Sequence, residues 1–486
     1  MTRYKSILSK TAIIIFLAAF GMPAAIAQNI RTAYFMKDAT HRHQLNPAFQ
    51  TSNGYMSIPL PVLGGSFQAG INTNTLSLDN LFYPNPNQKG GLVTFLHNSV
   101  PADKFLGSLK ENNHLNLEFN IPVLSTAFHT KIGYFSFDAG VKAYTGFSIP
   151  KGFFEFAKLG LTAEEGESYQ FGNMNIDASS YLDLGLGYSR KINENLTIGG
   201  KFKVLLGLVD TRIHYSKIDA TMTDEAWTME TRGTFDLSAS GLSDEGSIGE
   251  NLKNIDYSPA LAFSGMGVGV DLGATYKMID MFDGVAGDIF DKMTFSAAVV
   301  DLGFINWNQK NTISAIAEGE PFIFDGFELD LTDSNEETPS LGDQFGDYGD
   351  QIAEAFNFRK TSSESYKRML RTTLNIGAEY ELLKDKVSFG LLSSTRFGAP
   401  GTWSELTLSG NYQPISWFGA TLSYSFIHSR FQTFGWALNF TPCWINFFIG
   451  SDYMITNVSK QFAPLTNAMN INFGLSFPMG RNTAKN

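Results

Sequence analysis

The chain has only one cysteine, Cys443, among its 486 residues. A single thiol excludes an intrachain disulfide framework and every paired-cysteine metal motif. Charged residues are also scarce, at 17%. After Gln28 no uncharged apolar run is long enough to span a membrane as a helix. The sequence therefore leaves two classes, a soluble exported protein and a membrane-spanning β-barrel.

Residues 1–27 have the organisation of a secretory signal peptide. Arg3, Lys5 and Lys10 precede an apolar stretch, and the small-x-small pattern Ala25-Ile26-Ala27 follows it. This pattern predicts cleavage before Gln28 and export of the mature chain. The alternative is an N-terminal membrane anchor, but the apolar run is short for a spanning helix.

Aromatic residues and glycine are abundant, at 14% aromatic with 42 Phe and 46 Gly. Apolar and polar residues alternate from Leu115 to Ile121, and the same period of two recurs along the rest of the chain. Alternation of this kind predicts strands with one apolar and one polar face. We therefore expect an all-β fold, a transmembrane antiparallel β-barrel of about 14 strands (14–16) over residues 54–480. Helical spacing appears only in loops, at 101–110 and 151–159.

Three connections are very short, at residues 191–195, 384–386 and 413–416. Counting strands back from a last strand that ends in the periplasm puts all three on the periplasmic side, where bacterial barrels have their short turns. To keep the number of strands even, this count needs one extra strand between Leu302 and Arg371, such as 322–331. We expect an outer-membrane location, both mature termini in the periplasm, and a periplasmic tail at 481–486.

The closing segment of the chain carries Phe473 and Phe477 on its apolar face and resembles the strand by which barrels are inserted. Four tryptophans near strand ends are expected to form an interfacial girdle; they are Trp403, Trp417, Trp436 and Trp444. The alternative for these tryptophans is the core of a soluble sandwich. Residues 311–358 hold many acidic residues and no Lys or Arg. They predict a solvated long loop, with a cation-collecting loop as the alternative.

Residues 28–53 are too irregular for a strand and too charged to face lipid. Asn46-Pro47 is a turn signal, because the residue before proline avoids helical geometry. We expect this segment to fold into the lumen as a plug, with Asn46, Pro47, Ala48 and Phe49 as its hatch-like residues. A flexible periplasmic leader is the alternative.

Three stretches carry a resemblance to a known family: Arg31–Phe49, Gly54–Pro59 and Leu81–Pro84. They resemble a family of uncharacterised outer-membrane proteins from Bacteroidota, a domain of unknown function. Asn46-Pro47-Ala48 is more distantly similar to the N-terminal hatch of FadL-type transporters and to PorV/PorP-like proteins, although Phe49 stands where that hatch has glycine. The resemblance implies a 14-stranded barrel with a lumenal plug.

Catalytic signals are weak. His41 and His43 are the only close histidine pair, and no third ligand lies nearby, so no metal site is predicted. His214 with Ser216, and His428 with Ser429, would need a carboxylate from elsewhere to form an enzyme site. We predict no catalytic residues, no cofactor and no nucleic-acid partner.

Three functions remain open at this point. The first is a plugged conduit for hydrophobic small molecules; the second is a non-transporting accessory or anchoring barrel of a secretion or surface assembly; the third, an outer-membrane enzyme, has the least support. The expected partners are outer-membrane lipid and lipopolysaccharide, the barrel-assembly machinery, and either a hydrophobic ligand or a secretion-system partner.

Overall fold

A computed structural model describes residues 30–57, 67–75, 78–86, 92–159, 168–172, 174–222, 227–242, 263–279, 283–324, 358–384, 386–398, 401–428, 431–442, 444–454 and 468–481. The predicted signal peptide, most of the acidic loop and Cys443 lie outside these residues. Within them, no helix is long and apolar enough to cross a membrane.

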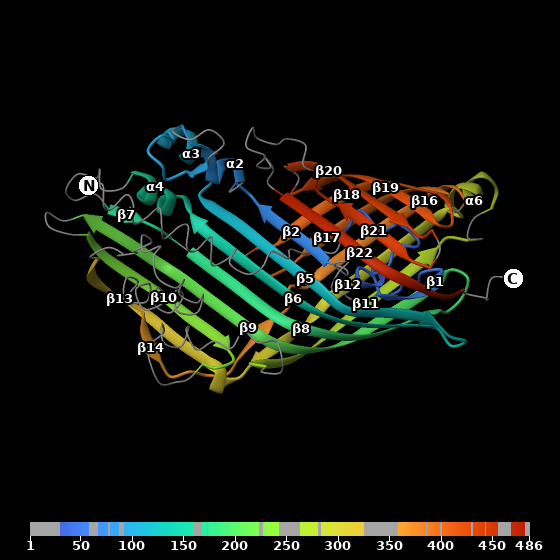
Figure 1. The fold of residues 1–486 in the computed structure, drawn as a ribbon, viewed down its shortest axis with the longest axis horizontal. Helices are drawn as coiled ribbons and strands as arrows, with labels where there is room; N and C mark the ends of the chain where they lie inside the picture. Colours follow the sequence, from blue (N-terminus) through green and yellow to red (C-terminus); the bar gives the residue numbers. More distant parts are fainter. Residues whose placement is uncertain are drawn as a thin grey trace.

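The structure is a closed antiparallel β-barrel with 14 positions around its ring, as the alternation predicted (Figure 1). We call each position a stave, whether it is one continuous strand or several strands in line. Ten staves are single strands: β5 (Asn112–His129), β6 (Tyr134–Pro150), β8 (Met174–Lys191), β9 (Leu196–Met222), β17 (Val387–Arg396), β18 (Trp403–Ile415), β19 (Phe418–Ile427), β20 (Phe431–Phe440), β21 (Asn446–Ser451) and β22 (Ala468–Arg481). Each pairs with the next along the chain except where the barrel closes and where interrupted staves intervene.

Four staves are interrupted and consist of collinear strands. The first is β1 (Asn53–Ser57) with β2 (Phe67–Thr73), and both strands pair with β22 and with β5, which closes the ring. The others are β10 (Trp227–Ala239) with β11 (Gly265–Lys277), β12 (Met293–Trp307) with β13 (Thr312–Phe324), and β14 (Arg359–Thr361) with β15 (Tyr366–Met369) and β16 (Thr373–Leu383).

The interrupted staves correct one expectation. The sequence suggested a separate extra strand between Leu302 and Arg371, such as 322–331. The apolar run found there, β13, instead continues β12 and pairs with β10 and β14. Since β12 also pairs directly with β16, no additional stave separates them. One long stave, broken at Asn308, replaces the two short strands, and because β12 and β16 are themselves antiparallel the strand directions alternate without an extra strand.

The two ends of the barrel differ. One end, the turn end, has the tight β8–β9, β16–β17 and β18–β19 hairpins, together with helix α6 (Gly284–Phe290) and the end of β22. The other end, the loop end, has helices α2 (Leu78–Leu81), α3 (Ala102–Leu106) and α4 (Lys151–Leu159) and the short strands β3 (Phe82–Pro84), β4 (Leu92–Thr94) and β7 (Ser168–Gln170). Helices α3 and α4 confirm the two helical loop segments expected from the sequence.

The outward face of the wall is apolar. Leu186, Met266, Leu422 and Phe434 each expose more than half of their surface, and they alternate with buried small or polar residues. A soluble protein would bury such a band, whereas lipid tails cover it without cost. The alternation and the closed ring together define a transmembrane barrel.

Charged side chains on the opposite face meet inside the barrel. Lys142 of β6 contacts Asp301 of β12, and Arg368 of β15 contacts Asp177 of β8. These strands are not neighbours in the ring, so their side chains reach one another only through the lumen. The lumen therefore holds many charged groups, whereas the apolar cluster at helices α3 and α4 lies outside it. Leu115 and Phe147, for example, project away from the lumen and are covered by α3 and α4.

Candidate functional site in the barrel lumen

The segment Ile30–Thr51, which we call the plug, lies inside the barrel and packs against its inner wall (Figure 1). It has no regular structure beyond one turn of 3-10 helix, η1 (Arg42–Gln44). Backbone hydrogen bonds between near neighbours, such as Tyr34 to Arg31, fold it into successive tight turns. Almost every residue in it is buried, so the lumenal plug expected from the sequence is present.

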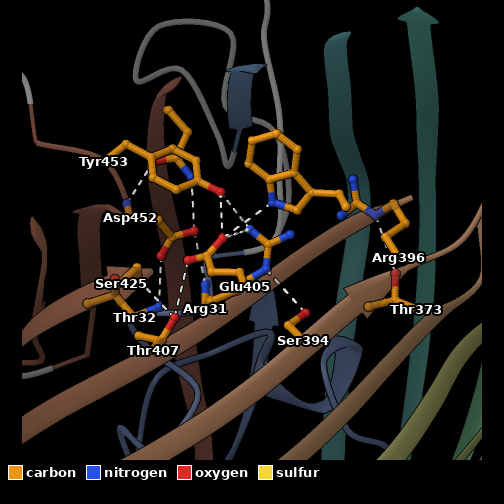
Figure 2. A network of polar contacts seen from close by, with 12 residues as sticks. Arg31, Thr32, Thr373, Ser394, Arg396, Glu405, Thr407, Ser425, Asp452 and Tyr453 are labelled. Atoms are coloured by element: carbon orange, nitrogen blue, oxygen red, sulfur yellow. Dashed lines mark hydrogen bonds and ion pairs between the residues drawn. The ribbon is translucent and has the colours of Figure 1, made fainter. Parts of the chain in front are cut away.

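The first anchor of the plug is Arg31. Its guanidinium donates to Glu405 Oε2 at 3.2 Å, to the Tyr453 hydroxyl at 2.9 Å and to Ser394 at 3.3 Å. Figure 2 shows these groups gathered around the arginine from β17, β18 and the segment after β21. Arg31 and Glu405 are almost fully buried, and a buried pair of this kind is stable only because each charge is completely matched.

The backbone beside Arg31 is held as well. The N–H groups of Arg31 and Thr32 donate to the two oxygens of Asp452, at 3.1 and 2.7 Å. The Thr32 hydroxyl lies 2.8 Å from the Ser423 hydroxyl on β19. Burial alone would lower the pKa of Arg31, but Tyr453, Glu405 and Asp452 hold that pKa above its ordinary value. The guanidinium therefore stays charged at any pH the protein meets.

The second anchor is the hatch-like turn. Asn46 accepts a hydrogen bond from the Ala48 N–H at 2.9 Å and donates to carbonyls of Ala274 and Ala297 at 3.4 Å. The wall approaches this turn at Gly199 and Gly273, where any Cβ would collide with Pro47 or Asn46. Phe49 is buried with its ring under the Arg42 guanidinium, 4.1 Å from ring centre to Cζ. All four predicted hatch residues thus lie in the lumen.

Aromatic residues fill the remaining space between plug and wall. Tyr34 packs edge-on against Phe35 and Phe49, with ring centres 4.9 and 4.8 Å apart. Its hydroxyl donates to Ser296 of β12 at 3.1 Å. The rings fit because Gly377 and Gly390 face them without side chains.

A third contact joins the plug to a group of charged wall residues. His43 Nε2 lies 2.9 Å and Gln44 Nε2 3.0 Å from the carboxylate of Asp138 on β6. Lys201 binds the same carboxylate at 2.6 Å. His41 contacts the Tyr55 ring edge-on, and its two ring nitrogens are buried without hydrogen-bond partners.

Burial lowers the pKa of both plug histidines. The pKa of His41 falls from 6.5 to about 4, chiefly through burial, with Asp138 opposing the fall. The pKa of His43 is lowered for the same reason. Both imidazoles are therefore neutral at neutral pH.

A small cavity of about 30 Å³ borders the plug beside Gln44. Its charged lining consists of Asp138, Lys142, Asp183, Lys201, Lys203 and Asp271. Lys203 contacts Asp271 at 2.6 Å and Asp301 at 2.5 Å. Asp301 sits at a bulge of β12 with φ of 58°, and its backbone N–H donates to Asp271. This strained bulge places the carboxylate between two lysines.

The predicted girdle residues divide into two groups. Trp417 and Trp444 are 44% and 69% exposed, and Trp436 lies half-buried on the outward face, so for these three the girdle stays a prediction. Trp403 instead faces the lumen, packs on Tyr453 and lies 3.5 Å from Glu405, so it is not part of an outer girdle. Its place at a strand end did not reveal which face it occupies. On β22, Phe477 stacks on Trp444 at 5.9 Å.

Histidine and serine residues do not converge on an enzyme site in the described residues. His214 contacts Asn175, and His428 packs on Trp403. No group of three or more possible metal ligands occurs in the part of the chain that the structure describes. The residues that sequence reasoning missed are Arg31, Glu405 and Asp452. The one signal in the sequence was the position of Arg31. A positive charge in a segment expected to fill the lumen needs a buried carboxylate as its partner.

The ring of 14 antiparallel staves, the apolar outer face and the buried plug define an outer-membrane β-barrel whose lumen holds an N-terminal segment. A family model matches residues 47–452, and the chain belongs to that family, described as a family of unknown function (DUF5723).

Solved structures with a similar arrangement include two toluene transporters. TbuX of Ralstonia pickettii is 8% identical with a TM-score of 0.37, over 94% of this chain and 96% of that one. TodX of Pseudomonas putida is 9% identical with a TM-score of 0.34, over 90% and 93%. The monoaromatic hydrocarbon channel CymD is 10% identical with a TM-score of 0.31, over 94% and 95%. No curated protein sequence matches the chain.

Proposed function

We propose that this chain is a gated outer-membrane channel for small solutes, in which the plug closes the lumen at rest and moves during passage. The observation that carries the proposal is the fit between plug and wall. Gly199, Gly273, Gly377 and Gly390 face the plug, so the wall is shaped around a segment that non-covalent contacts alone hold in place. A segment held in this way is free to leave when its contacts are exchanged for others.

The lining of the lumen favours a polar solute over a hydrophobic one. A conduit for hydrophobic molecules predicts an apolar pocket beside the plug, but charged side chains make up half of the twelve residues that line the cavity beside Gln44. An apolar molecule offers these charges no hydrogen bonds, and a buried charge without a partner costs far more than a buried neutral group. We therefore assign polar small molecules to this channel.

We further propose that the turn end faces the periplasm. The mature chain would begin at Gln28, only two residues before the plug, and the plug would enter from the side on which β22 ends. Labelling of engineered cysteines in intact cells tests this orientation. A cysteine in the β18–β19 turn should be labelled only after the outer membrane is permeabilised, and labelling in intact cells would reverse the assignment.

The gating proposal is tested by locking the plug to the wall. In a Cys443→Ser background, Thr32→Cys and Ser423→Cys place two thiols where hydroxyls now lie 2.8 Å apart. A disulfide should form there, because the 2.8 Å separation of the hydroxyls brings sulfur atoms at the same positions close to the bonded S–S distance of about 2.05 Å. Purified full-length protein is then reconstituted in liposomes, and the flux of a small polar solute is measured.

We expect the oxidised double variant to show background flux and the reduced protein to recover the flux of the parent. Thr32→Cys alone, treated with the same oxidant, is the matched control. Equal flux through oxidised and reduced protein would refute gating by the plug. An absence of flux in every form, together with a large partner that co-purifies from native membranes, would support an accessory barrel instead.

A further inference from the structure

On the loop side of Arg31, ionised side chains from opposite walls meet across the lumen. Six residues form this arrangement, which we call the cross-lumen belt: Glu118, Asp177, Asp210, Arg368, Arg371 and Arg396. The belt lies next to Arg31, whose charge acts on Glu118 and Arg396, but the glycine-shaped seat of the plug does not require it.

The contacts within the belt are short and buried. Arg368 donates to Asp177 at 2.6 Å and to Asp210 at 2.9 Å. Arg371 donates to Glu118 at 2.9 Å, and Arg396 binds the same Glu118 oxygen. The side chains of all six are 14% exposed or less. Nε of Arg371 is buried and has no hydrogen-bond partner.

The two signs of charge are segregated between the walls. The arginines come from β15, from the residues just before β16, and from β17. The carboxylates come from β5, β8 and β9, which lie across the ring. The Tyr144 ring of β6 lies between them, with the Cζ atoms of Arg368 and Arg371 at 5.6 and 5.0 Å from its centre. The belt therefore spans the lumen from a positive wall to a negative wall.

Passage through the belt requires that these ion pairs open. Separating a buried pair leaves two unmatched charges, which is strongly unfavourable unless other groups replace both partners. A carboxylate on the solute would replace Glu118 at Arg371 and Arg396, where an unpartnered N–H is already available. An ammonium on the solute would replace Arg368 at Asp177 and Asp210.

We propose that the cross-lumen belt selects zwitterionic small solutes, which carry one carboxylate and one ammonium group. An anion alone would leave the aspartates unmatched, and a cation alone would leave the arginines unmatched. A neutral molecule would satisfy neither wall. This inference rests on the proposed channel function and names its class of substrate.

The test uses four solutes of the same length: 4-aminobutanoate (zwitterion), 4-aminobutanamide (cation), succinamate (anion) and succinamide (neutral). Full-length protein carrying Arg31→Gln and Glu405→Gln, which removes the ion pair of the first plug anchor, is reconstituted in liposomes. We expect 4-aminobutanoate to enter at least about tenfold faster than each of the others, because each of them leaves one or more buried charges unmatched.

Substitutions within the belt should shift this preference in opposite directions. In the same background, Glu118→Gln frees Arg371 and Arg396, so the entry of succinamate should rise about tenfold relative to 4-aminobutanoate. Arg368→Gln frees Asp177 and Asp210, so 4-aminobutanamide should gain instead. The matched control is Arg359→Gln on β14, which is 56% exposed and pairs with Glu318 and Glu320 at the rim. It should change neither ratio.

Each outcome decides one of the two proposals. Equal entry of all four solutes, or belt variants that behave like Arg359→Gln, would overturn zwitterion selection and leave the channel function standing. If no solute enters the loosened-plug variant, the channel function itself fails. Asp177→Asn replaces Arg368→Gln if that variant does not fold, and it should reduce the entry of 4-aminobutanamide relative to succinamate.

Discussion

Two glycines of neighbouring strands, Gly199 on β9 and Gly273 on β11, allow the plug to turn at Asn46 and Pro47. Both are wall positions at which a Cβ would overlap plug atoms. Neither glycine needs a left-handed backbone, so their role is to allow close approach rather than to permit unusual dihedral angles.

Gly199→Ala and Gly273→Ala should therefore unseat the plug while leaving the barrel folded. Overpacking costs about 1–3 kcal/mol, which is roughly a tenfold or greater rise in the population of the released plug. Hydrogen exchange of residues 30–51 measures this population. Gly200→Ala is the matched control, because a Cβ there meets only Asp271 and Leu272 atoms at 3.7–3.8 Å. Unchanged exchange in the first two variants would show that the plug adapts to the added methyl groups.

Acidification should loosen the plug through His41. Its pKa is about 4 when the plug is seated and about 6.5 when the plug is released, so the released form takes up the proton first. The seated form is fully favoured above pH 6.5 and loses roughly tenfold for each pH unit between 6.5 and 4. Hydrogen exchange of the plug against pH reports this loss.

His41→Asn is the control for this pH dependence, since Asn tolerates the left-handed backbone found at His41, where φ is 70°. In the variant, the number of protons taken up on plug release, which sets the slope of plug stability against pH, should fall by about one. Some pH dependence should remain, because the pKa of His43 is also lowered and His43 continues to titrate. An identical slope in wild type and variant would remove His41 from the pH response.

The plug, as an element, depends on a charge pair that it forms with the wall. Arg31→Ala would leave Glu405 buried without its cation, which costs about 3–5 kcal/mol and should release the N-terminal part of the plug. Lys37→Ala is the control, because the Lys37–Glu381 pair is about one-third exposed and such pairs contribute 0–1 kcal/mol.

Protease sensitivity near Arg31 in detergent-solubilised barrel distinguishes the two variants. Cleavage should appear in Arg31→Ala and not in Lys37→Ala. Restoration of resistance in Arg31→Lys, which returns a cation beside Glu405, would confirm that the unmatched carboxylate causes the release. Resistance in all three would mean that Asp452 and the hatch-like turn hold the plug without Arg31.

The strands of the barrel wall could be predicted from the sequence more easily than the points at which a stave is divided into separate strands. The alternation in β5, β8 and β22 is a local property, so the sequence displays it directly. The strands β10 and β11 are aligned by their shared neighbour β9, and β12 and β13 are aligned by β11 and β10. Nothing in the sequence near Asn308 shows that β13 continues β12 rather than forming a new stave.

The whole barrel depends on its outward band meeting lipid. Leu422 on β19 is 68% exposed and points outward. Leu422→Arg should destabilise the folded barrel by about 2–4 kcal/mol if it lies near the bilayer midplane. Denaturant unfolding in liposomes, monitored by heat-modifiable gel mobility, measures the change. Val285→Arg on α6, which is 78% exposed at the turn end, should change it by less than about 0.5 kcal/mol. Equal effects would contradict the assigned lipid boundary.

The sequence by itself determined that the chain is a β-barrel with an N-terminal plug. Period-two alternation and the irregular, charged stretch before the first strand are encoded between near neighbours in the chain. Asn46, Pro47, Ala48 and Phe49 could be selected for the same reason, since a turn before proline is a local signal.

Only the tertiary structure decided which charges meet in the lumen. Glu118 and Arg396 are far apart in sequence and lie on opposite walls, and strand alternation gives each only a face, not a partner. Trp403 shows the same limit, because its side follows from the register of β18 against its neighbours. Closure of the ring at 14 staves decides which lumenal side chains face one another. The charged lumen on which the proposed function rests follows from that closure.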